Sequence, residues 1–431
     1  MSESLVPSRP QSRRPHVVII GGGFAGIAAA KALGHCEADV TIIDRRNHHI
    51  FQPLLYQVAT AVLAPADVAA PIRQLSARQK NVSVLLAEVI GVDLASRTVE
   101  IKYPGARDKR VAFDYLVVAA GVQSSYFGHN EFARYAPCLK TITDAQTIRS
   151  KILSAYEMAE STDDDDERRR QMTFVLVGAG PTGVELAASI AQMATTTLRA
   201  NFRRIDPATT SIFLLDGAKR VLPSFAESSS VRAAQRLAKL GVKVITGALV
   251  ENIDDKGVTV GGKRIDSGTV LWTAGVSPSQ IVKMLGATTD RAGRACVGPF
   301  LNLADAGGIF VVGDAATLIQ DGRPLPGVAQ VAIQQGRYVG RFIAREIGGG
   351  KPPRPFRYFD KGNMAVIGKN FAIMESGRVK LAGIIPWFIW AFLHVMFLPQ
   401  LQNQRRVQNQ WFWSYFTGQR SSRLVDEAPR I

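Results

Sequence analysis

The sequence predicts an α/β protein with two parallel sheets, and three observations support this prediction. An apolar strand, a glycine-rich turn and a helix occur twice, beginning at Val17 and again at Phe174. In both copies a second apolar strand follows and ends in an aspartate. The 431 residues exceed one ordinary hydrophobic core, so we expect two or three domains.

The first copy, Val17–Gly26, reads VVIIGGGFAG and contains the spacing G-x-G-x-x-G. The first glycine makes a tight turn, the second lets backbone N–H groups approach a pyrophosphate, and the third lets helix and strand pack closely. These glycines are Gly21, Gly23 and Gly26. The next strand ends in Asp44, whose carboxylate can accept hydrogen bonds from ribose hydroxyls. The sequence therefore predicts a Rossmann-like dinucleotide site; a glycine-rich turn beside a solvated aspartate is the alternative.

Several segments complete the predicted first domain. The mixed segment Arg45–Ala59 is interpreted as a loop that covers a ligand. Val82–Leu86 and Arg97–Tyr103 alternate as strands of a small meander. Asp114–Gly121 is a buried strand whose small end, Ala120 and Gly121, leaves room for a cofactor.

The second copy has the same parts in the same order. Its glycines are Gly178, Gly180 and Gly183, its acidic strand is Ser211–Asp216, and a later strand again ends in Ala-Gly, at Gly275. Lys243–Thr246 and Gly257–Ile265 are interpreted as a repeat of the meander. The duplication predicts two dinucleotide sites, although one site with a degenerate copy remains possible on these residues.

The remaining segments connect the copies. Thr143–Glu160 is predicted as a helix, and the charge block Asp163–Arg170 as a solvated loop or helix end. Gly308–Asp314 returns the chain to the first domain, and Asp314 suits a ribityl or pyrophosphate contact. A later helix carries two amides on successive turns, Gln330 and Gln334, and is interpreted as part of a cap. Phe356–Ile373 is interpreted as more of this cap.

The C-terminal tail has a different character. Ile384–Leu398 carries no formal charge, includes His394 and is shorter than the roughly 20 residues that span a bilayer. Arg405–Phe416 combines two arginines with aromatic residues, which favour anionic headgroups and the membrane interface. We expect an amphipathic anchor lying in the membrane plane. A tilted span and a dimerisation face without a membrane are the alternatives.

The composition limits the class of protein. The net charge of +16 suits an anionic membrane, an acidic partner or nucleic acid, but no Lys/Arg run interleaved with aromatic residues indicates a nucleic-acid site. Cys36, Cys138 and Cys296 are scattered, so we expect no disulfide, metal site or redox dithiol and a reduced, cytosolic setting. Residues 1–15 lack an apolar signal core and are predicted to be a disordered tail.

The two glycine motifs and the Val-Gly-Asp run ending at Asp314 resemble the two-dinucleotide-binding flavoprotein superfamily. Within it the chain is most similar to the type II, non-proton-pumping NADH:quinone oxidoreductases. The matching runs are Asn47–Thr60, Gly178–Ala187, Ala329–Gly336 and Asp360–Ile373. The family usually has Gly-Phe-Arg-Asn-Arg after its apolar tail, where this chain has Gln400–Gln404.

The resemblance implies an FAD-binding domain (16–141 and 290–375), an inserted NADH-binding domain (142–289) and a membrane-associating segment (376–431). It implies NADH and a membrane quinone as substrates, an anionic membrane as partner, a possible homodimer, and a peripheral location on the cytoplasmic face of the inner (plasma) membrane. The implied FAD-site positions are Gly21, Gly23, Phe24, Ala25, Gly26, Asp44, Arg45, Ala120, Gly121, Asp314, Ala329, Gln330 and Lys369. The implied NADH-site positions are Gly178, Gly180, Pro181, Thr182, Gly183, Glu185, Asp216 and Gly275.

Three residues have implied catalytic roles. Glu185 would lie near the isoalloxazine, although a carboxylate in the first turn of a helix also favours the helix dipole. Gln330 and Gln334 would face a quinone, or belong to a surface helix. Lys369 would steady flavin or quinone, or solvate a loop, and His394 would extend to the interface or relay a proton.

The predicted activity is hydride transfer from NADH to FAD, followed by two-electron transfer to a quinone. Asp216 favours NADH over NADPH because its carboxylate would repel a 2′-phosphate. A soluble NAD(P)H-dependent flavin reductase acting on ferredoxin or oxygen is the main alternative. A non-enzymatic NAD-sensing or nucleic-acid-binding flavoprotein is a second.

Overall fold

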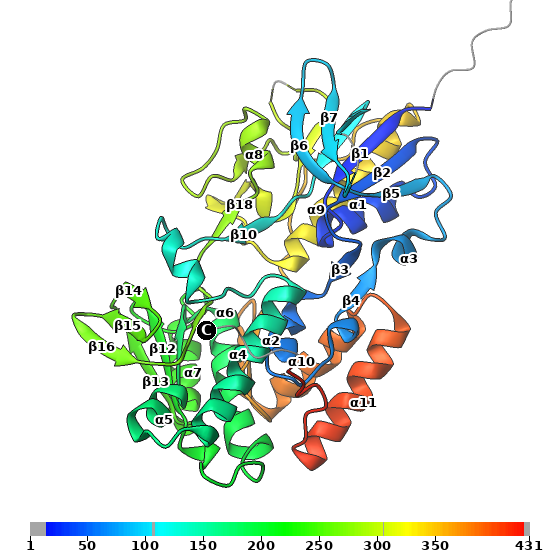
Figure 1. Ribbon diagram of the computed structural model, residues 1–431. Helices are drawn as coiled ribbons and strands as arrows, with labels where there is room; N and C mark the ends of the chain where they lie inside the picture. The colour runs from blue at the N-terminus through cyan, green and yellow to red at the C-terminus, as the bar shows by residue number, and fades with distance from the viewer. Residues whose placement is uncertain (1–13, 106–107, 305, 426–431) are drawn as a thin grey trace, which may run out of the picture. The chain divides into compact units, whose positions relative to one another are not determined.

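Each glycine turn lies at the carboxyl end of the first strand of a parallel sheet, one in each of two compact units (Figure 1). The structure is a computed structural model that describes residues 14–105, 108–304 and 306–425. The first unit comprises the described residues up to His49, Pro71–Val122 and Pro278–Tyr358. The second comprises Ile50–Ala70, Gln123–Ser277 and the described residues from Phe359. The boundaries of these compact units differ from those of the FAD-binding and NADH-binding domains expected from the sequence. The assignment of those two domains stays a prediction.

The first unit is built on a five-stranded sheet in the order β20-β9-β1-β2-β5. Its strands are β1 (His16–Ile20), β2 (Asp39–Asp44), β5 (Val82–Leu86), β9 (Tyr115–Val118) and β20 (Ile309–Val311), all paired in parallel. Val82–Leu86 is therefore part of this sheet, and its assignment to a meander was wrong. The return of the chain to this sheet at β20 was predicted.

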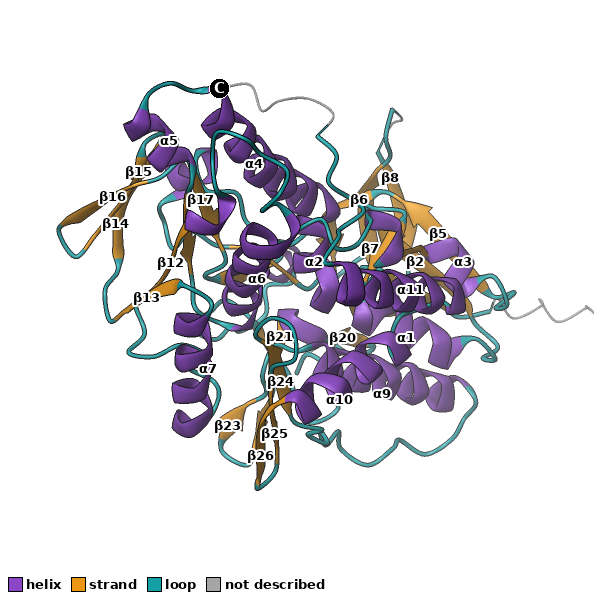
Figure 2. Ribbon diagram, turned by 90° about the horizontal axis from the view of Figure 1, so that it is seen from below, coloured by secondary structure: helices purple, strands orange, loops and turns teal. Residues whose placement is uncertain are grey.

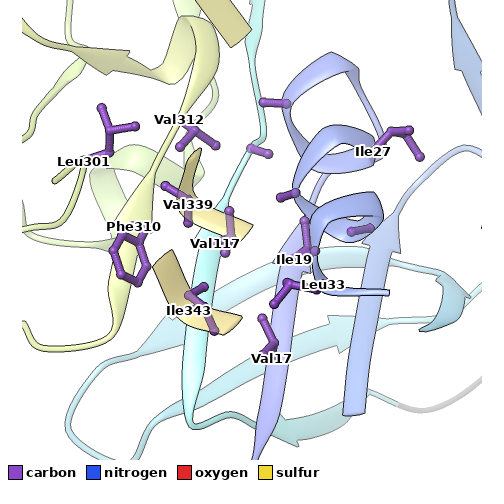
Figure 3. Packing of buried hydrophobic residues seen from close by; sticks show 14 of the residues in the cluster. Val17, Ile19, Ile27, Leu33, Val117, Leu301, Phe310, Val312, Val339 and Ile343 are labelled. Carbon is purple, nitrogen blue, oxygen red and sulfur yellow. The ribbon is translucent and has the colours of Figure 1, made fainter. Parts of the chain in front are cut away.

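The core of this unit follows from the alternation of side chains along β1. Val17 and Ile19 pack with helices α1 (Phe24–Leu33) and α9 (Ala329–Ile347), as Figure 3 shows. Val18 and Ile20 pack on the other face with an antiparallel meander. Its strands are β6 (Glu88–Asp93), β7 (Thr98–Lys102) and β8 (Lys109–Ala112). A strand that is buried on both faces needs apolar side chains at successive positions. The sequence of β1 meets this need, because it is apolar from Val17 to Ile20.

Short elements complete the first unit and its connections. They are β3 (His48–Ile50), β4 (Ala69–Pro71), α3 (Ile72–Ser76), β10 (Val122–Ser124), β18 (Val276–Pro278), α8 (Ile281–Met284), β19 (Ala295–Cys296), a 3₁₀ turn (Gly313–Ala315), β21 (Ala316–Thr317), β22 (Ile319–Gln320) and β23 (Arg323–Pro324).

The second unit repeats the architecture around a parallel sheet in the order β13-β12-β11-β17. Its strands are β11 (Thr173–Val177), β12 (Ser211–Asp216), β13 (Val242–Thr246) and β17 (Thr269–Trp272). The antiparallel meander is β14 (Val250–Asp254), β15 (Gly257–Val260) and β16 (Lys263–Asp266). Lys243–Thr246 thus belongs to the parallel sheet, so its assignment to the meander was also wrong.

The second unit also contains helices and short helical turns. They are α2 (Leu55–Ala59), α4 (Ile142–Ser161), α5 (Asp165–Gln171), α6 (Pro181–Gln192), a π-helical turn (Met193–Thr197) and α7 (Glu227–Lys239), with 3₁₀ turns at Gln52–Leu54, Pro65–Asp67, Asn130–Arg134 and Pro207–Thr209. The helix predicted over 143–160 is α4.

Two sequence interpretations in this unit need correction. The charge block forms a helix of its own, α5, because Asp164 accepts N–H bonds at its start and three arginines pair with acids three residues earlier. The supposed ligand-covering loop 45–59 ends in α2, all five residues of which are buried. The end of the segment is therefore helical, whereas its predicted contact with a ligand stays a prediction.

The C-terminal part of the second unit starts with an antiparallel sheet and continues into two helices (Figure 2). The sheet contains β24 (Asn363–Val366), β25 (Ala372–Ser376) and β26 (Val379–Gly383), so the interpretation of 356–373 as part of the α9 cap was wrong. The helices are α10 (Ile384–Met396) and α11 (Leu401–Thr417). Among the described residues, none of the helices combines the length and hydrophobicity that crossing a membrane requires.

Candidate functional site

The first glycine turn has the geometry that its spacing predicts. Gly21 has φ +103°, and a side chain there would overlap the carbonyl of Ala119. A Cβ on Gly26 would overlap the Gly21 carbonyl, so helix and strand meet backbone to backbone. A Cβ on the exposed Gly23 would meet nothing within 4 Å. The N-terminus of α1 is therefore open to a phosphate, where the helix dipole favours an anion.

One carboxylate oxygen of Asp44 accepts a hydrogen bond from this turn, and the other accepts one from the residues that follow Asp44. Its Oδ2 accepts the N–H of Gly22 at 2.7 Å, and its Oδ1 accepts the N–H of Arg46 at 2.8 Å. His49 holds the same turn from the other side, because its Nδ1–H donates to the Gly22 carbonyl at 3.1 Å. Burial lowers the pKa of His49 to about 4, so the ring is neutral at pH 7. His49 was not singled out from the sequence.

Helix α9 crosses α1 close to the glycine turn. A Cβ at Gly336 would overlap the Ala25 carbonyl, and one at Gly340 would lie 2.6 Å from the Ala29 carbonyl oxygen. This crossing places the start of α9, with Ala329, Gln330 and Gln334, in the same unit as the first glycine turn. The neighbouring Gln335 is buried, and its Oε1 accepts the Gly313 N–H at 2.6 Å.

The first unit thus gathers most of the predicted FAD positions. Ala120 and Gly121 follow strand β9, with Gly121 at φ +63°, and Asp314 follows β20. Phe24 and Ala25 start α1, and Arg45 is exposed beyond Asp44. Open backbone donors at a helix start, an anchored acid and small residues at the strand ends fit a dinucleotide cofactor. Lys369 is the exception, because it lies in the second unit.

The second glycine turn has the same construction. Gly178 has φ +109°, and a Cβ there would lie 2.6 Å from the Ala274 nitrogen. A Cβ at Gly183 would overlap the Gly178 carbonyl, whereas one at Gly180 would meet nothing within 4 Å. Pro181 is the first residue of α6, where its fixed φ suits the helix and a missing N–H costs nothing.

Asp216 repeats the position of Asp44. Its Oδ2 accepts the N–H of Ala179 at 2.5 Å, and its Oδ1 accepts the N–H of Ala218 at 2.7 Å. Lys219, which follows Ala218, is exposed. Arg220 donates to the Pro223 carbonyl at 3.1 Å. The carboxylate therefore lies at the carboxyl end of β12, where a ribose would be bound.

Glu185 lines a pocket of about 140 Å³ in the second unit. Burial raises its pKa to about 8, and the opposing effect of the Val366 N–H, 3.3 Å from Oε1, is smaller. The carboxyl group is therefore mostly protonated at pH 7 and can donate a hydrogen bond. The pocket is lined by Gln52, Pro53, Leu55, Tyr56, Ser124, Leu139, Lys140, Thr182, Glu185, Trp272, Thr273, Ala274, Gly275 and Val276. It brings together Thr182, Glu185 and Gly275 of the predicted NADH positions.

Two interpretations of charged residues change with this geometry. Glu185 is the fifth residue of α6 and not in its first turn, so the suggestion of an ionised, dipole-stabilised carboxylate was wrong. Lys369 is exposed, and its ammonium donates to the Tyr415 carbonyl at 2.6 Å and lies 3.8 Å from the centre of the Tyr415 ring. It thereby joins the turn after β24 to α11.

His394 does not extend as a cation toward an interface. Burial lowers its pKa to about 4, and its Nδ1–H donates to the Trp390 carbonyl at 2.7 Å. Trp390 stacks on Trp411 of α11 with ring centres 5.3 Å apart, and the Trp411 N–H donates to Gln57 at 2.7 Å. An aromatic cluster therefore joins the two C-terminal helices to α2.

Two residues of the run Gln400–Gln404 contact the protein, Asn403 at the position where the family also has asparagine and Gln404 at a position where the family has arginine. Asn403 is buried and donates to three carbonyls of residues 66, 67 and 69 at 2.9–3.0 Å. Gln404 donates to the carbonyls of Met396 and Leu398 at the end of α10. This run anchors α11 to the second unit.

Arg420 was missed entirely by sequence reasoning. Its buried guanidinium donates to the carbonyls of Thr60 and Ser189 at 2.8 and 3.0 Å. Burial lowers its pKa to about 10, so it remains charged at pH 7. It ties the end of the chain to α2 and α6, the helices that carry Tyr56 and Glu185.

Comparison with known proteins agrees with this geometry. Residues 15–336 match the family described as pyridine nucleotide-disulphide oxidoreductase. The chain is 41% identical to the type II NADH:quinone oxidoreductase Ndh of Mycobacterium tuberculosis, over 99% of this chain and 94% of that protein. It is 42% identical to NdhA of the same organism, over 93% and 87%. Its fold matches NDH2 of Plasmodium falciparum in complex with NADH, with a TM-score of 0.86 and 19% identity, covering 96% of this chain and 100% of that one.

Proposed function

The chain belongs to the type II NADH:quinone oxidoreductases, and from this membership we propose that it oxidises NADH with bound FAD and reduces a membrane quinone without pumping protons. The observation that carries the proposal is the repeated glycine turn, in which each aspartate accepts an N–H of its own turn. Two such turns suit two dinucleotides, a flavin cofactor and a nicotinamide substrate.

The chemistry that FAD supplies when bound is hydride acceptance from NADH and two-electron transfer to a quinone. The protein's task is to hold the reacting groups, because hydride transfer between two rings needs no side-chain acid or base. In the first unit the open N-terminus of α1 would take the pyrophosphate and Asp44 the ribose. Ala120, Gly121 and Asp314 would line the flavin half.

In the second unit the turn 178–183 would take the pyrophosphate of NADH, and Asp216 the adenosine ribose. Its carboxylate would repel a 2′-phosphate, which favours NADH over NADPH. The neutral carboxyl of Glu185 would donate a hydrogen bond to the carboxamide end of the coenzyme. We assign Gln330 and Gln334 to the quinone head group, whose carbonyl oxygens accept amide N–H bonds.

The quinone is lipid-soluble, so the enzyme must reach a membrane, and α10 and α11 supply a suitable face. Large apolar side chains on these helices are exposed: Ile384, Ile385, Phe388, Phe392, Met396, Leu401, Phe412, Trp413 and Phe416. Arg405 and Arg406 are exposed on α11, and Lys380 on the adjoining strand β26. We propose peripheral docking on anionic lipid from the cytoplasmic side. A homodimer through the same face is the competing interpretation.

The docking is tested with the purified enzyme and vesicles. Vesicles with phosphatidylglycerol should sediment the wild-type protein more strongly than vesicles of phosphatidylcholine, and salt should weaken the difference. Phe388→Ser with Phe392→Ser should abolish sedimentation. Unchanged sedimentation, with a loss of dimers in light scattering, would assign the face to self-association.

The activity is tested anaerobically on the absorbance of the purified protein. We expect an oxidised flavin spectrum that bleaches with one equivalent of NADH and recovers when a short-chain quinone is added. Bleaching without recovery would contradict the quinone assignment and indicate a soluble acceptor such as ferredoxin. Absence of flavin in the purified and reconstituted protein would contradict the assignment of the first glycine turn.

A further inference from the structure

A chain of two hydrogen bonds leads from the C-terminal helix α11 to the pocket that contains Glu185. The indole N–H of Trp411 donates to Gln57 Oε1 at 2.7 Å, and Gln57 Nε2 donates to the Tyr56 hydroxyl oxygen at 3.0 Å. Gln57 and Tyr56 are buried, and Tyr56 lines the pocket together with Glu185. All four residues belong to the second unit. This chain therefore connects α11 with a pocket for which a substrate is proposed.

The two hydrogen bonds can run in only one direction. An indole N–H can donate but cannot accept, so the Gln57 amide must turn its oxygen toward Trp411. The NH2 group of the amide then faces Tyr56, whose hydroxyl oxygen must accept. The hydroxyl hydrogen of Tyr56 is thereby directed away from Gln57. Burial raises the pKa of Tyr56 well above its ordinary value, so the hydroxyl keeps this hydrogen at pH 7.

The hydroxyl hydrogen of Tyr56 has no acceptor within the part of the chain that the structure describes. The hydroxyl oxygen accepts from Gln57, and the hydroxyl forms no second hydrogen bond with a described residue. Tyr56 is only 6% exposed. A buried donor left unpaired costs roughly 1–3 kcal/mol, so a ligand whose carbonyl oxygen takes this hydrogen is favoured.

Both ends of this arrangement are fixed by further contacts. The Thr60 hydroxyl donates to the Tyr56 carbonyl at 2.9 Å, and the Arg420 guanidinium donates to the Thr60 carbonyl at 2.8 Å. On α11, Trp411 stacks on the buried Trp390 with ring centres 5.3 Å apart and 25° between the ring planes. The backbone of Tyr56 and the indole of Trp411 are therefore both held in place.

We propose that Gln57 and Trp411 turn the Tyr56 hydroxyl hydrogen toward a substrate carbonyl in this pocket. The inference rests on the proposed function, which brings two carbonyl compounds to the enzyme. These are the carboxamide of NADH and the ring carbonyl of a quinone, and both accept a hydrogen bond from a phenol. Tyr56 binds and orients the carbonyl and keeps its own proton. Gln57 and Trp411 are positioning residues that act through Tyr56.

The test measures the two half-reactions of the holoenzyme separately by stopped flow. They are reduction of the flavin by NADH and its reoxidation by a short-chain quinone. Tyr56→Phe removes the hydroxyl and should raise the half-saturating concentration of at least one substrate by about threefold to tenfold, with little change in the limiting rate. The substrate that is affected supplies the carbonyl.

Gln57→Glu reverses the direction of the inner hydrogen bond while keeping the shape of the side chain. The introduced carboxylate accepts from both Trp411 and Tyr56, so the hydroxyl hydrogen turns away from the pocket. This variant should therefore raise the same half-saturating concentration as Tyr56→Phe does. Gln235→Glu makes the same exchange at an exposed position on α7, and this matched control should behave as wild type.

The double variant distinguishes positioning from structural support. If Gln57 acts through the hydroxyl, Gln57→Glu should have no further effect when it is added to Tyr56→Phe, whereas structural damage would add to the loss. Trp411→Phe keeps an aromatic ring but loses the N–H, and it should likewise have an effect only when the Tyr56 hydroxyl is present.

Two results would overturn the inference: a Tyr56→Phe enzyme with wild-type half-saturation for both substrates, or additive effects in the double variant. The proposed function fails in a different way. In that case the flavin of the wild-type protein is not bleached by NADH, or its absorbance does not recover when the quinone is added.

Discussion

Replacing Glu185 with glutamine should remove a strong pH dependence from the stability of the protein. In the unfolded chain a glutamate ionises with a pKa near 4.5, whereas burial in the folded protein raises the pKa of Glu185 to about 8. The folded protein therefore favours the protonated form of this group more strongly than the unfolded chain does. Its raised pKa means that stability is greatest below pH 4.5 and is lost as the pH rises toward 8. Above pH 8 the loss is complete and constant.

The size of the effect follows from the two pKa values. At about 1.4 kcal/mol for each pH unit, the wild-type protein loses about 5 kcal/mol of unfolding free energy between pH 4.5 and 8, and about 3 kcal/mol by pH 7. Glutamine has nearly the same shape and no titrating group. It should accept the Val366 N–H through its amide oxygen and leave the pocket intact.

The assay is thermal and urea unfolding of the holoenzyme between pH 5 and pH 8.5, with flavin fluorescence and circular dichroism as probes. Stability of the Glu185→Gln protein relative to wild type should increase with pH and level off above pH 8. Glu227→Gln, an exposed position at the start of α7, serves as the matched control and should run parallel to wild type. Parallel curves for Glu185→Gln and wild type would refute the protonated carboxyl.

Three further predictions concern other contacts. Asp216→Asn should raise the ratio of kcat/KM for NADPH over NADH by about tenfold or more, because it removes the carboxylate that repels a 2′-phosphate; an unchanged ratio in steady-state assays would contradict this. Asn403→Ala should lower the unfolding free energy by about 1–3 kcal/mol and weaken vesicle binding, while the exposed Gln402→Ala should do neither. Gly336→Ala should lower the unfolding free energy by about 1–3 kcal/mol, because the added Cβ overpacks against α1, and should yield protein with less flavin. Gly307→Ala is the control, because a Cβ there meets nothing within 4 Å, and should behave as wild type in thermal unfolding and flavin content.

Features that depend on local chemistry could be predicted from the sequence. Gly21 and Gly178 need a positive φ, and the acids at the ends of the second strands follow from the strand pattern. The return of the chain at β20 was also predicted. These signals are confined to a few consecutive residues, so no knowledge of tertiary contacts was needed.

Features that depend on distant partners could not be predicted. The protonation of Glu185 depends on burial beside Val366, 181 residues later in the chain. Arg420 looks like a surface residue because arginine is rarely buried, and its burial requires carbonyls of α2 and α6. The short buried helix α2 was interpreted as a loop because five residues show no helical period.

Part of helix α11 inverts the usual distribution of side chains. On α11 the amide of Asn403 is buried with three carbonyl partners, while Phe412 and Phe416 are 69% and 70% exposed. In water this arrangement loses hydrophobic free energy on the outside and needs exact polar pairing on the inside. It becomes favourable when the outer face lies in an apolar medium, because the aromatic side chains are then solvated and the inner polar anchors still fix the helix. The inversion therefore supports docking of this face on a membrane, where the proposed quinone is dissolved.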